Sequence, residues 1–197
     1  MLLDAYCQGA FPMARGRDSH EVYWFSPDPR GVIPLDTFHR PRSLQRVIRR
    51  GTFDVSHDND FEQVIRGCAA PRRYEQETWI NDGVIDAYCQ LHALGYAHSI
   101  EVRRDGMLVG GLYGVAIGAA FFGESMFHLP GIGNNASKVA LAATVDHLNL
   151  RGYTLFDVQF TNPFLEPFGV DEIPRDHYLQ LLDAAVRRRV TWYDPPR

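Results

Sequence analysis

The sequence predicts an α+β fold in which a mixed sheet is flanked by helices. Three observations favour this class. Residues 119–160 contain a strand, a helix and a second strand, which is the order of a βαβ-like unit. Residues 97–115 contain two strands joined by Asp105-Gly106, the strongest short signal for a hairpin. Helices dominate the residues before this hairpin, so the order is helices, an antiparallel meander and then a crossover helix.

The N-terminal residues lack a regular pattern. They are rich in proline, glycine and aromatic residues, and the run SPDPRG at 26–31 marks turns and extended backbone. We therefore expect a small irregular N-terminal lobe over residues 1–38 and a larger domain over residues 39–197. From Pro41 onward the pattern becomes regular.

The larger domain begins with short elements, namely a helix over 43–50 and a strand over 52–56. A helix over 60–68 follows from four apolar residues at the i, i+3, i+4, i+7 positions, Phe61, Val64, Ile65 and Cys68. A helix over 82–94 is indicated by Asn81 or Asp82 as its N-cap and by Gly95 as its stop.

The later elements have clear boundaries. Strands are expected over 97–104, 107–115, 119–127 and 154–160, and a closing helix over 176–188. The crossover helix over 135–150 has apolar residues Leu141, Val145 and Leu148 at helical spacing, with Asn134 or Asn135 as its N-cap. Gly152 ends it.

Composition narrows the function classes. The chain has 197 residues, 45% of them hydrophobic, enough for a sizeable core. It contains no apolar run of membrane-spanning length and no signal peptide, which favours a cytoplasmic protein. Three cysteines without a CxxC and eight histidines without paired spacing argue against a disulfide framework and a metal site. With a net charge of −4, any nucleic-acid contact requires a local basic patch.

One strand carries two polar residues on the same face. Asp157 and Gln159 alternate with Phe156, Val158 and Phe160, and strand side chains point to opposite faces in turn. Two polar groups aimed together from an otherwise apolar strand indicate a functional site. The alternative is that they face solvent from a half-buried strand.

Short motifs along nearly the whole chain occur in a collinear order. They are AYCQGAFP at 5–12, WFSPDPRGVIP at 24–34, ETWI at 77–80, HSIEV at 98–102, LVGGLYGV at 108–115, GESMF at 123–127, NASK at 135–138, DVQ at 157–159 and EIPR at 172–175. Together they resemble the leucyl/phenylalanyl-tRNA-protein transferase family. The resemblance implies an N-acetyltransferase-like fold for the larger domain. Members of the family usually carry a further stretch before AYCQGAFP, so the N-terminal lobe is expected to be truncated relative to the family.

The resemblance also implies an activity. Such an enzyme moves Leu, Phe or a similar apolar residue from aminoacyl-tRNA to the N-terminal α-amine of an acceptor protein that begins with Arg or Lys, and so marks it for degradation. The ester of aminoacyl-tRNA is already activated, so the reaction needs positioning and a proton acceptor, with no cofactor and no covalent nucleophile. Asp157 and Gln159 are the catalytic residues that the resemblance favours. Gln159 would accept a hydrogen bond from the amine, and Asp157 would orient it.

The resemblance places a set of residues around the substrate. The apolar side chains would surround Leu or Phe, Glu124 would face an amino group, and Trp79 would stack on the terminal adenosine. The full set is Trp79, Leu112, Phe121, Gly123, Glu124, Met126, Leu141 and Phe156. The alternatives are that the residues around Glu124 belong to an ordinary core strand and that Trp79 is only an anchor in the core. Where the family tends to have a second tryptophan, this chain has Met13.

A basic stripe lies on the first predicted helix of the larger domain. It consists of four arginines at helical spacing, Arg42, Arg46, Arg49 and Arg50. These side chains could follow a tRNA backbone, and the alternative is that they simply form a solvated helix face.

The turn before the crossover helix departs from the family. Gly131-Ile132-Gly133 is a glycine-rich link of the kind that cradles anions, which favours an acyl-CoA-dependent N-acyltransferase as an alternative function. The preceding His128 matches the acyl-CoA pattern only in part. Two further functions remain open, namely that of a non-catalytic tRNA-binding relative and that of a structural protein.

Overall fold

The computed structural model describes residues 2–17, 19, 21–71 and 78–193. Glu77 of the ETWI motif lies outside these ranges. The main sheet has seven strands in the order β4-β5-β6-β7-β8-β3-β9. Their bounds are β3 Arg30–Ile33, β4 Asp54–His57, β5 Ala97–Arg104, β6 Met107–Ile117, β7 Ala120–His128, β8 Leu155–Gln159 and β9 Asp171–Ile173.

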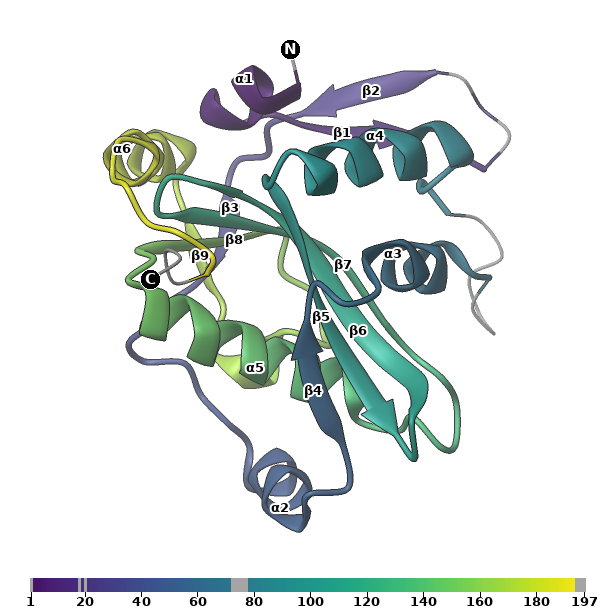
Figure 1. The fold of residues 1–197 in the computed structure, drawn as a ribbon. Helices are drawn as coiled ribbons and strands as arrows, with labels where there is room; N and C mark the ends of the chain where they lie inside the picture. Colours follow the sequence, from purple (N-terminus) through teal and green to yellow (C-terminus); the bar gives the residue numbers. More distant parts are fainter. Residues whose placement is uncertain (1, 18, 20, 72–77, 194–197) are drawn as a thin grey trace.

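Helices cover both faces of this sheet (Figure 1). α3 (Phe61–Ala69) and α4 (Asp82–Ala93) pack on one face, and α5 (Ala136–Arg151) packs on the other, where α2 (Arg42–Arg50) contacts it. β7 and β8 are parallel and are joined by α5, whereas β3, β4, β5, β6 and β9 pair with their neighbours in antiparallel fashion. The predicted α+β class with a mixed sheet is therefore confirmed.

Local signals in the sequence set most element boundaries. The side chain of Asn81 caps α4 by accepting a hydrogen bond from the Val84 amide at 2.8 Å, and Gly152 ends α5 with a φ of 78°. Asn135 is the N-cap residue of α5, which confirms one of the two predicted candidates, although its side chain does not act as a cap. Asn135 has a φ of 75° and makes no capping bond, and the side chain of Asn134 accepts from the Gly131 amide at 3.0 Å instead.

The N-terminal residues are more regular than expected. α1 (Leu2–Cys7) is followed by a two-stranded sheet of β1 (Phe11–Ala14) and β2 (Val22–Phe25). β3, which we expected to be part of the lobe, pairs with β8 and β9 inside the main sheet. β9 and the 3-10 turn before it, η1 (Glu166–Phe168), were not predicted either. The division of the chain at residue 38 stays a prediction.

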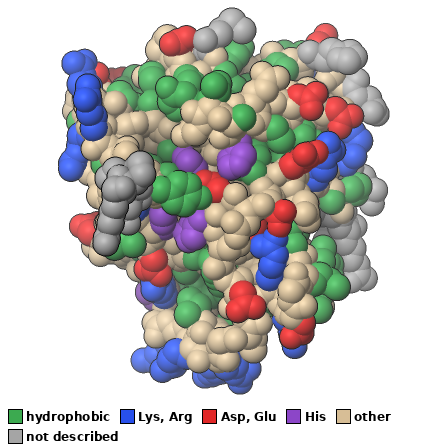
Figure 2. Space-filling view, viewed as in Figure 1, with side chains coloured by type: hydrophobic (Ala, Val, Ile, Leu, Met, Phe, Trp, Pro, Cys, Tyr) green, Lys and Arg blue, Asp and Glu red, His purple; other side chains and the backbone are tan. Residues whose placement is uncertain are grey.

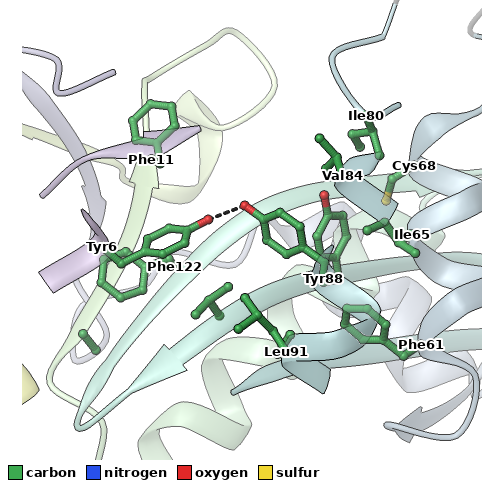
Figure 3. Close-up of a cluster of buried hydrophobic side chains, with 14 of the residues drawn as sticks. Tyr6, Phe11, Phe61, Ile65, Cys68, Ile80, Val84, Tyr88, Leu91 and Phe122 are labelled. Carbon is green, nitrogen blue, oxygen red and sulfur yellow. Dashed lines mark hydrogen bonds between the residues drawn. The ribbon is translucent and has the colours of Figure 1, made fainter. Parts of the chain in front are cut away.

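Two hydrophobic clusters lie on the two faces of the sheet. The first joins α1, α3 and α4 to β6 and β7, and contains Tyr6, Phe61, Tyr88 and Phe122 (Figure 3). The second joins α5 to the other face. α6 (Arg175–Val186) packs against β7 and β8 and contacts α1. Cys7, Cys68 and Cys89 are free thiols. Within the described residues, no helix has both the length and the apolar character needed to cross a membrane.

The glycine-rich turn before α5 uses its own amides. The Gly131 amide donates to Asn134 Oδ1, and the Gly133 amide donates to the Leu129 carbonyl, each at 3.0 Å. A Cβ on Gly133 would lie 2.3 Å from the Val109 carbonyl oxygen, so this glycine permits close backbone packing. Both glycine amides are therefore engaged within the protein and are not free to bind an anion.

Candidate active site

A pocket opens where the two parallel strands separate. β7 and β8 pair only from Ala120–Leu155 to Phe122–Asp157, and beyond these three pairs their side chains border a cavity of about 250 Å³. Strand ends leave backbone and side chains free to face a ligand, as at other openings in α/β sheets. The cavity is lined by Met13, Trp79, Leu112, Gly123, Glu124, Ser125, Met126, Leu141, Phe156, Val158, Gln159, Phe160, Asn162 and Leu165.

Most of the predicted catalytic and substrate-binding residues meet in this pocket. Those that line it are Trp79, Leu112, Gly123, Glu124, Met126, Leu141, Phe156 and Gln159. Phe121 and Asp157 do not line it, since both are completely buried behind its wall. The four arginines, Arg42, Arg46, Arg49 and Arg50, lie on α2, which contributes no lining residue. Lysine and arginine side chains gather at that end of the molecule in Figure 2.

Glu124 is a buried carboxylate held by two tyrosines. The Tyr6 hydroxyl donates to Oε1 at 2.7 Å, and the Tyr88 hydroxyl lies 3.3 Å from Oε2. The two hydroxyls also contact one another, from α1 on one side and α4 on the other (Figure 3). Gln159 Nε2 donates to Oε1 at 3.3 Å. A carboxylate in an apolar strand thus has the polar partners that its burial requires.

The Tyr6 hydroxyl, the Tyr88 hydroxyl and the Glu124 carboxyl group contact one another, and the number of protons they share depends on whether Glu124 is ionised. Each tyrosine hydroxyl supplies one proton, so the two hydroxyls can make only two of the three contacts when Glu124 is ionised. A protonated Glu124 supplies the third proton and closes a ring of three hydrogen bonds. The arrangement therefore suits both protonation states.

The environment of Glu124 brings its titration close to neutral pH. Burial raises the pKa of Glu124 to about 7, and the nearby charge of Asp157 adds to the increase, whereas the hydrogen bonds from Tyr6 and Tyr88 oppose it. A carboxyl group with a pKa near the working pH is suited to accept a proton during a reaction and release it afterwards.

Asp157 sits in a different environment, opposite Arg30 of β3. Arg30 Nε donates to Oδ1 at 2.9 Å and Nη2 donates to Oδ2 at 2.7 Å, a two-bond pair in which both side chains are at most 1% exposed. The Tyr178 hydroxyl of α6 adds a bond to Oδ2 at 2.7 Å. Asp157 is therefore fully engaged by protein groups and orients its surroundings from behind the pocket.

Asp157 also fixes the backbone of Gln159. Its Oδ1 accepts from the Gln159 amide at 2.8 Å, and Gln159 has a φ of 67°, a conformation that residues other than glycine rarely adopt. This conformation ends the alternation of the strand and turns Gln159 into the pocket. Because Nε2 of Gln159 donates to Glu124, its side-chain carbonyl oxygen is left to accept a hydrogen bond from a ligand.

The pocket combines a reactive polar end with an apolar wall. Glu124 and Gln159 form the polar end, and Leu112, Leu141 and Phe156 form part of the wall. Such a site can hold an apolar side chain and take a proton from a nearby amine. Among the residues that the structure describes, no three His, Cys, Asp or Glu side chains are grouped as metal ligands would be.

The groups that support this site were not predicted from the sequence. Arg30 and Tyr6 lie inside two of the family motifs, WFSPDPRGVIP and AYCQGAFP, but nothing nearby in the chain indicated their partners. Tyr88 and Tyr178 lie on amphipathic helices, where a buried tyrosine is ordinary. The one signal that could have found them is the presence of buried charges on strands, which require counter-charges from elsewhere.

Comparison with known proteins finds one family that matches most of the chain. The family model described as "Leucyl/phenylalanyl-tRNA protein transferase" matches residues 32–183, and the model of its N-terminal domain matches residues 1–28. Curated proteins named leucyl/phenylalanyl-tRNA–protein transferase are similar over most of the chain. The one from Chlorobium luteolum is 48% identical over 97% of this chain and 96% of its own length. The one from Maricaulis maris is 50% identical over 94% of this chain and 84% of its own length.

Solved structures show the same fold at low identity. FemX is 12% identical with a TM-score of 0.56, covering 92% of this chain and 70% of its own. The C-terminal domain of a lysylphosphatidylglycerol synthetase from Agrobacterium fabrum is 14% identical with a TM-score of 0.53, covering 93% and 69%. These likenesses concern the fold alone, and they agree with the predicted N-acetyltransferase-like class.

The buried pair gives a stability prediction. Asp157→Ala leaves the Arg30 guanidinium buried without a counter-charge, so we expect the free energy of unfolding to fall by about 3–5 kcal/mol. Gln159→Ala removes a pocket side chain without stranding a charge and should cost about 1 kcal/mol. The double variant Arg30→Met, Asp157→Leu should recover much of the loss. Urea unfolding of the three variants measures these values, and equal losses for Asp157→Ala and Gln159→Ala would contradict the structural role.

Proposed function

This chain belongs to the leucyl/phenylalanyl-tRNA protein transferase family, and we propose that the pocket between β7 and β8 is where it transfers the aminoacyl group. The observation that carries the proposal is the pairing, in one pocket, of a carboxyl group that titrates near neutral pH with an apolar wall. The donor is an aminoacyl-tRNA, and the acceptor is the N-terminal amine of a protein.

The chemistry follows from the groups that face the cavity. The acceptor amine attacks the ester carbonyl, a C–N bond forms, and the C–O bond to the ribose breaks. Gln159 accepts a hydrogen bond from the amine through its side-chain oxygen and directs the nitrogen lone pair at the carbonyl. Glu124 accepts the proton that the amine loses and returns it to the leaving ribose oxygen as the C–O bond breaks. Asp157 acts through the backbone of Gln159 as a positioning residue.

The apolar wall suits a Leu or Phe side chain. Four uncharged side chains offer it aliphatic and aromatic surface, namely Leu112, Met126, Leu141 and Phe156. A polar donor side chain would lose its hydration there without gaining a hydrogen-bond partner. Trp79 lies on the same cavity and offers a ring face for the terminal adenosine. Met13 lines the cavity as well, so the second adenosine wall is a thioether and not an indole.

The remaining assignments rest on the resemblance. The arginines of α2, which make no ion pair among the described residues, hold part of the tRNA backbone. The acceptor begins with Arg or Lys, the product is directed to degradation, and the reaction takes place in the cytoplasm. Against the acyl-CoA alternative, the amides of Gly131 and Gly133 are already engaged by hydrogen bonds within the protein.

A transfer assay tests the proposal. Purified protein is incubated with radiolabelled Leu-tRNA or Phe-tRNA and a peptide that begins with Arg, with the N-acetylated peptide as control. We expect label only on the free N-terminus, and Glu124→Gln and Gln159→Ala should each lower the rate by about 10²–10⁴-fold. Failure of the wild type to label the free peptide would refute the proposed function. Near-normal rates in either variant would remove that residue from the mechanism.

The raised pKa of Glu124 predicts a pH profile. Since its pKa is about 7, above the usual 4.5, the carboxylate is depleted below neutral pH and transfer should rise as pH increases through 7. Tyr6→Phe removes a hydrogen bond that favours the carboxylate, so the midpoint should move upward by about one pH unit.

The control for this profile is another buried tyrosine. Tyr113 is fully buried, and its hydroxyl has no hydrogen-bond partner in the described structure. Tyr113→Phe should therefore leave the midpoint in place, with the same acceptor peptide in every assay. Identical midpoints for Tyr6→Phe and the wild type would show that Glu124 does not control the profile.

Trp79 gives a binding prediction. If its ring stacks on the donor nucleoside, Trp79→Ala should weaken binding of a non-reactive aminoacyl-adenosine by about 1–3 kcal/mol, while Trp79→Phe keeps much of the affinity. Calorimetry measures both. Trp24, an exposed tryptophan outside this pocket, provides the control, since Trp24→Ala should change nothing. Unchanged affinity in Trp79→Ala together with a lower melting temperature would make Trp79 a core anchor only.

A further inference from the structure

The last residues that the structure describes form a strap, Thr191–Tyr193, fastened at both ends. Arg151, in the last turn of α5, donates to the Thr191 carbonyl at 2.8 Å and to the Tyr193 carbonyl at 2.6 Å. The Tyr193 hydroxyl donates to Asp58 Oδ2 at 2.9 Å. These bonds hold the residue between them, Trp192, in a defined place.

Trp192 is buried in a box of rings although it lies near the end of the chain. Its indole is 5% exposed and stacks on His98 with centroids 4.2 Å apart and an interplanar angle of 6°. His147 lies 4.2 Å away on another side, and burial lowers the pKa of His147 to about 4, so this neighbour is neutral at physiological pH. Histidine side chains gather at the centre of the face shown in Figure 2.

A line of three aromatic rings connects this box to the active-site pocket. The Trp192 ring lies 5.4 Å from the ring of Phe121, and Phe121 lies 5.5 Å from Phe156. Phe156 lines the pocket, whereas Phe121 is fully buried between the two. Because protein interiors are close-packed, the volume of Trp192 limits how far Phe121 and Phe156 can retreat from the pocket.

We propose that Trp192 is a specificity-determining positioning residue, which sets the depth of the donor pocket by supporting Phe121 and, through it, Phe156. The inference rests on the proposed function, because it assigns the apolar wall to the donor side chain. A smaller residue at 192 leaves space behind Phe121, the two phenylalanine rings move toward it, and the pocket deepens. Larger donor side chains then gain relative to leucine.

Donor selectivity tests the proposal. The kcat/KM for transfer is measured with tRNA charged with Leu, Phe or Trp, in the wild type, Trp192→Phe and Trp192→Leu. One methylene more or less in an apolar pocket alters selectivity by about 10–200-fold. We expect the Trp-to-Leu donor ratio to rise at least about tenfold in Trp192→Leu and less in Trp192→Phe, in the order of the volume removed.

The matched control changes the strap without touching the line of rings. Tyr193→Phe removes the bond to Asp58 but keeps Trp192 and the two bonds from Arg151 to the backbone of the strap, so the donor ratio should stay at the wild-type value. An unchanged ratio in both Trp192 variants, with only lower stability, would overturn the proposal. If Trp192→Leu does not fold, Trp192→Phe carries the test alone.

The proposed function and this inference fail in different ways. A wild type that transfers no donor at all fails the proposed function. In that case the affinities of non-reactive leucyl- and tryptophanyl-adenosine, measured by calorimetry in the same variants, still report the depth of the pocket. Equal affinity ratios in all variants, or no binding by the wild type, would overturn the role of Trp192.

Discussion

The ion pair between Arg30 and Asp157 is the contact on which the rest of the site depends. It joins β3 to β8 across 127 residues of chain, and Arg30 also donates to the Gly9 carbonyl at 2.9 Å, which ties the loop after α1 to the sheet. The Tyr178 hydroxyl brings α6 to the same carboxylate. A buried pair of this kind contributes little net stability, but losing one partner is costly, so it fixes which segments must meet.

The same ion pair makes the environment of Asp157 different from that of Glu124, the second carboxyl group of the site. Asp157 has a guanidinium opposite it, whereas Glu124 has only neutral hydroxyl and amide groups as its hydrogen-bond partners. Burial therefore dominates at Glu124 and raises its pKa to about 7. Two carboxyl groups on adjacent strands thus differ by their partners, one suited to orientation and the other to proton transfer.

Features set by neighbouring residues could be predicted from the sequence, and features set by distant ones could not. Asp105 and Gly106 both have positive φ, as their hairpin requires, and Asn81 caps α4 as its side chain predicts. β3 was missed because its proline-rich approach resembles a loop, and it becomes a strand through its pairing with the distant segments β8 and β9. The tyrosines around Glu124 come from α1 and α4, and the Tyr6 bond spans 118 residues. Phe121 and Leu112 are both apolar residues on predicted strands, and the sequence does not distinguish their positions. The packing of the folded chain places Leu112 on the pocket wall and Phe121 behind it.

We propose that the cavity between β7 and β8 receives the aminoacyl end of the donor. A crystal structure with a non-reactive leucyl- or phenylalanyl-adenosine measures this most directly. We expect the amino-acid side chain against Leu112, Leu141 and Phe156, with its carbonyl group beside Gln159 and Glu124. A ligand bound instead in the cavity of about 660 Å³ that Pro71, Leu129 and Phe164 help to line, with its carbonyl group away from Gln159, would contradict the account.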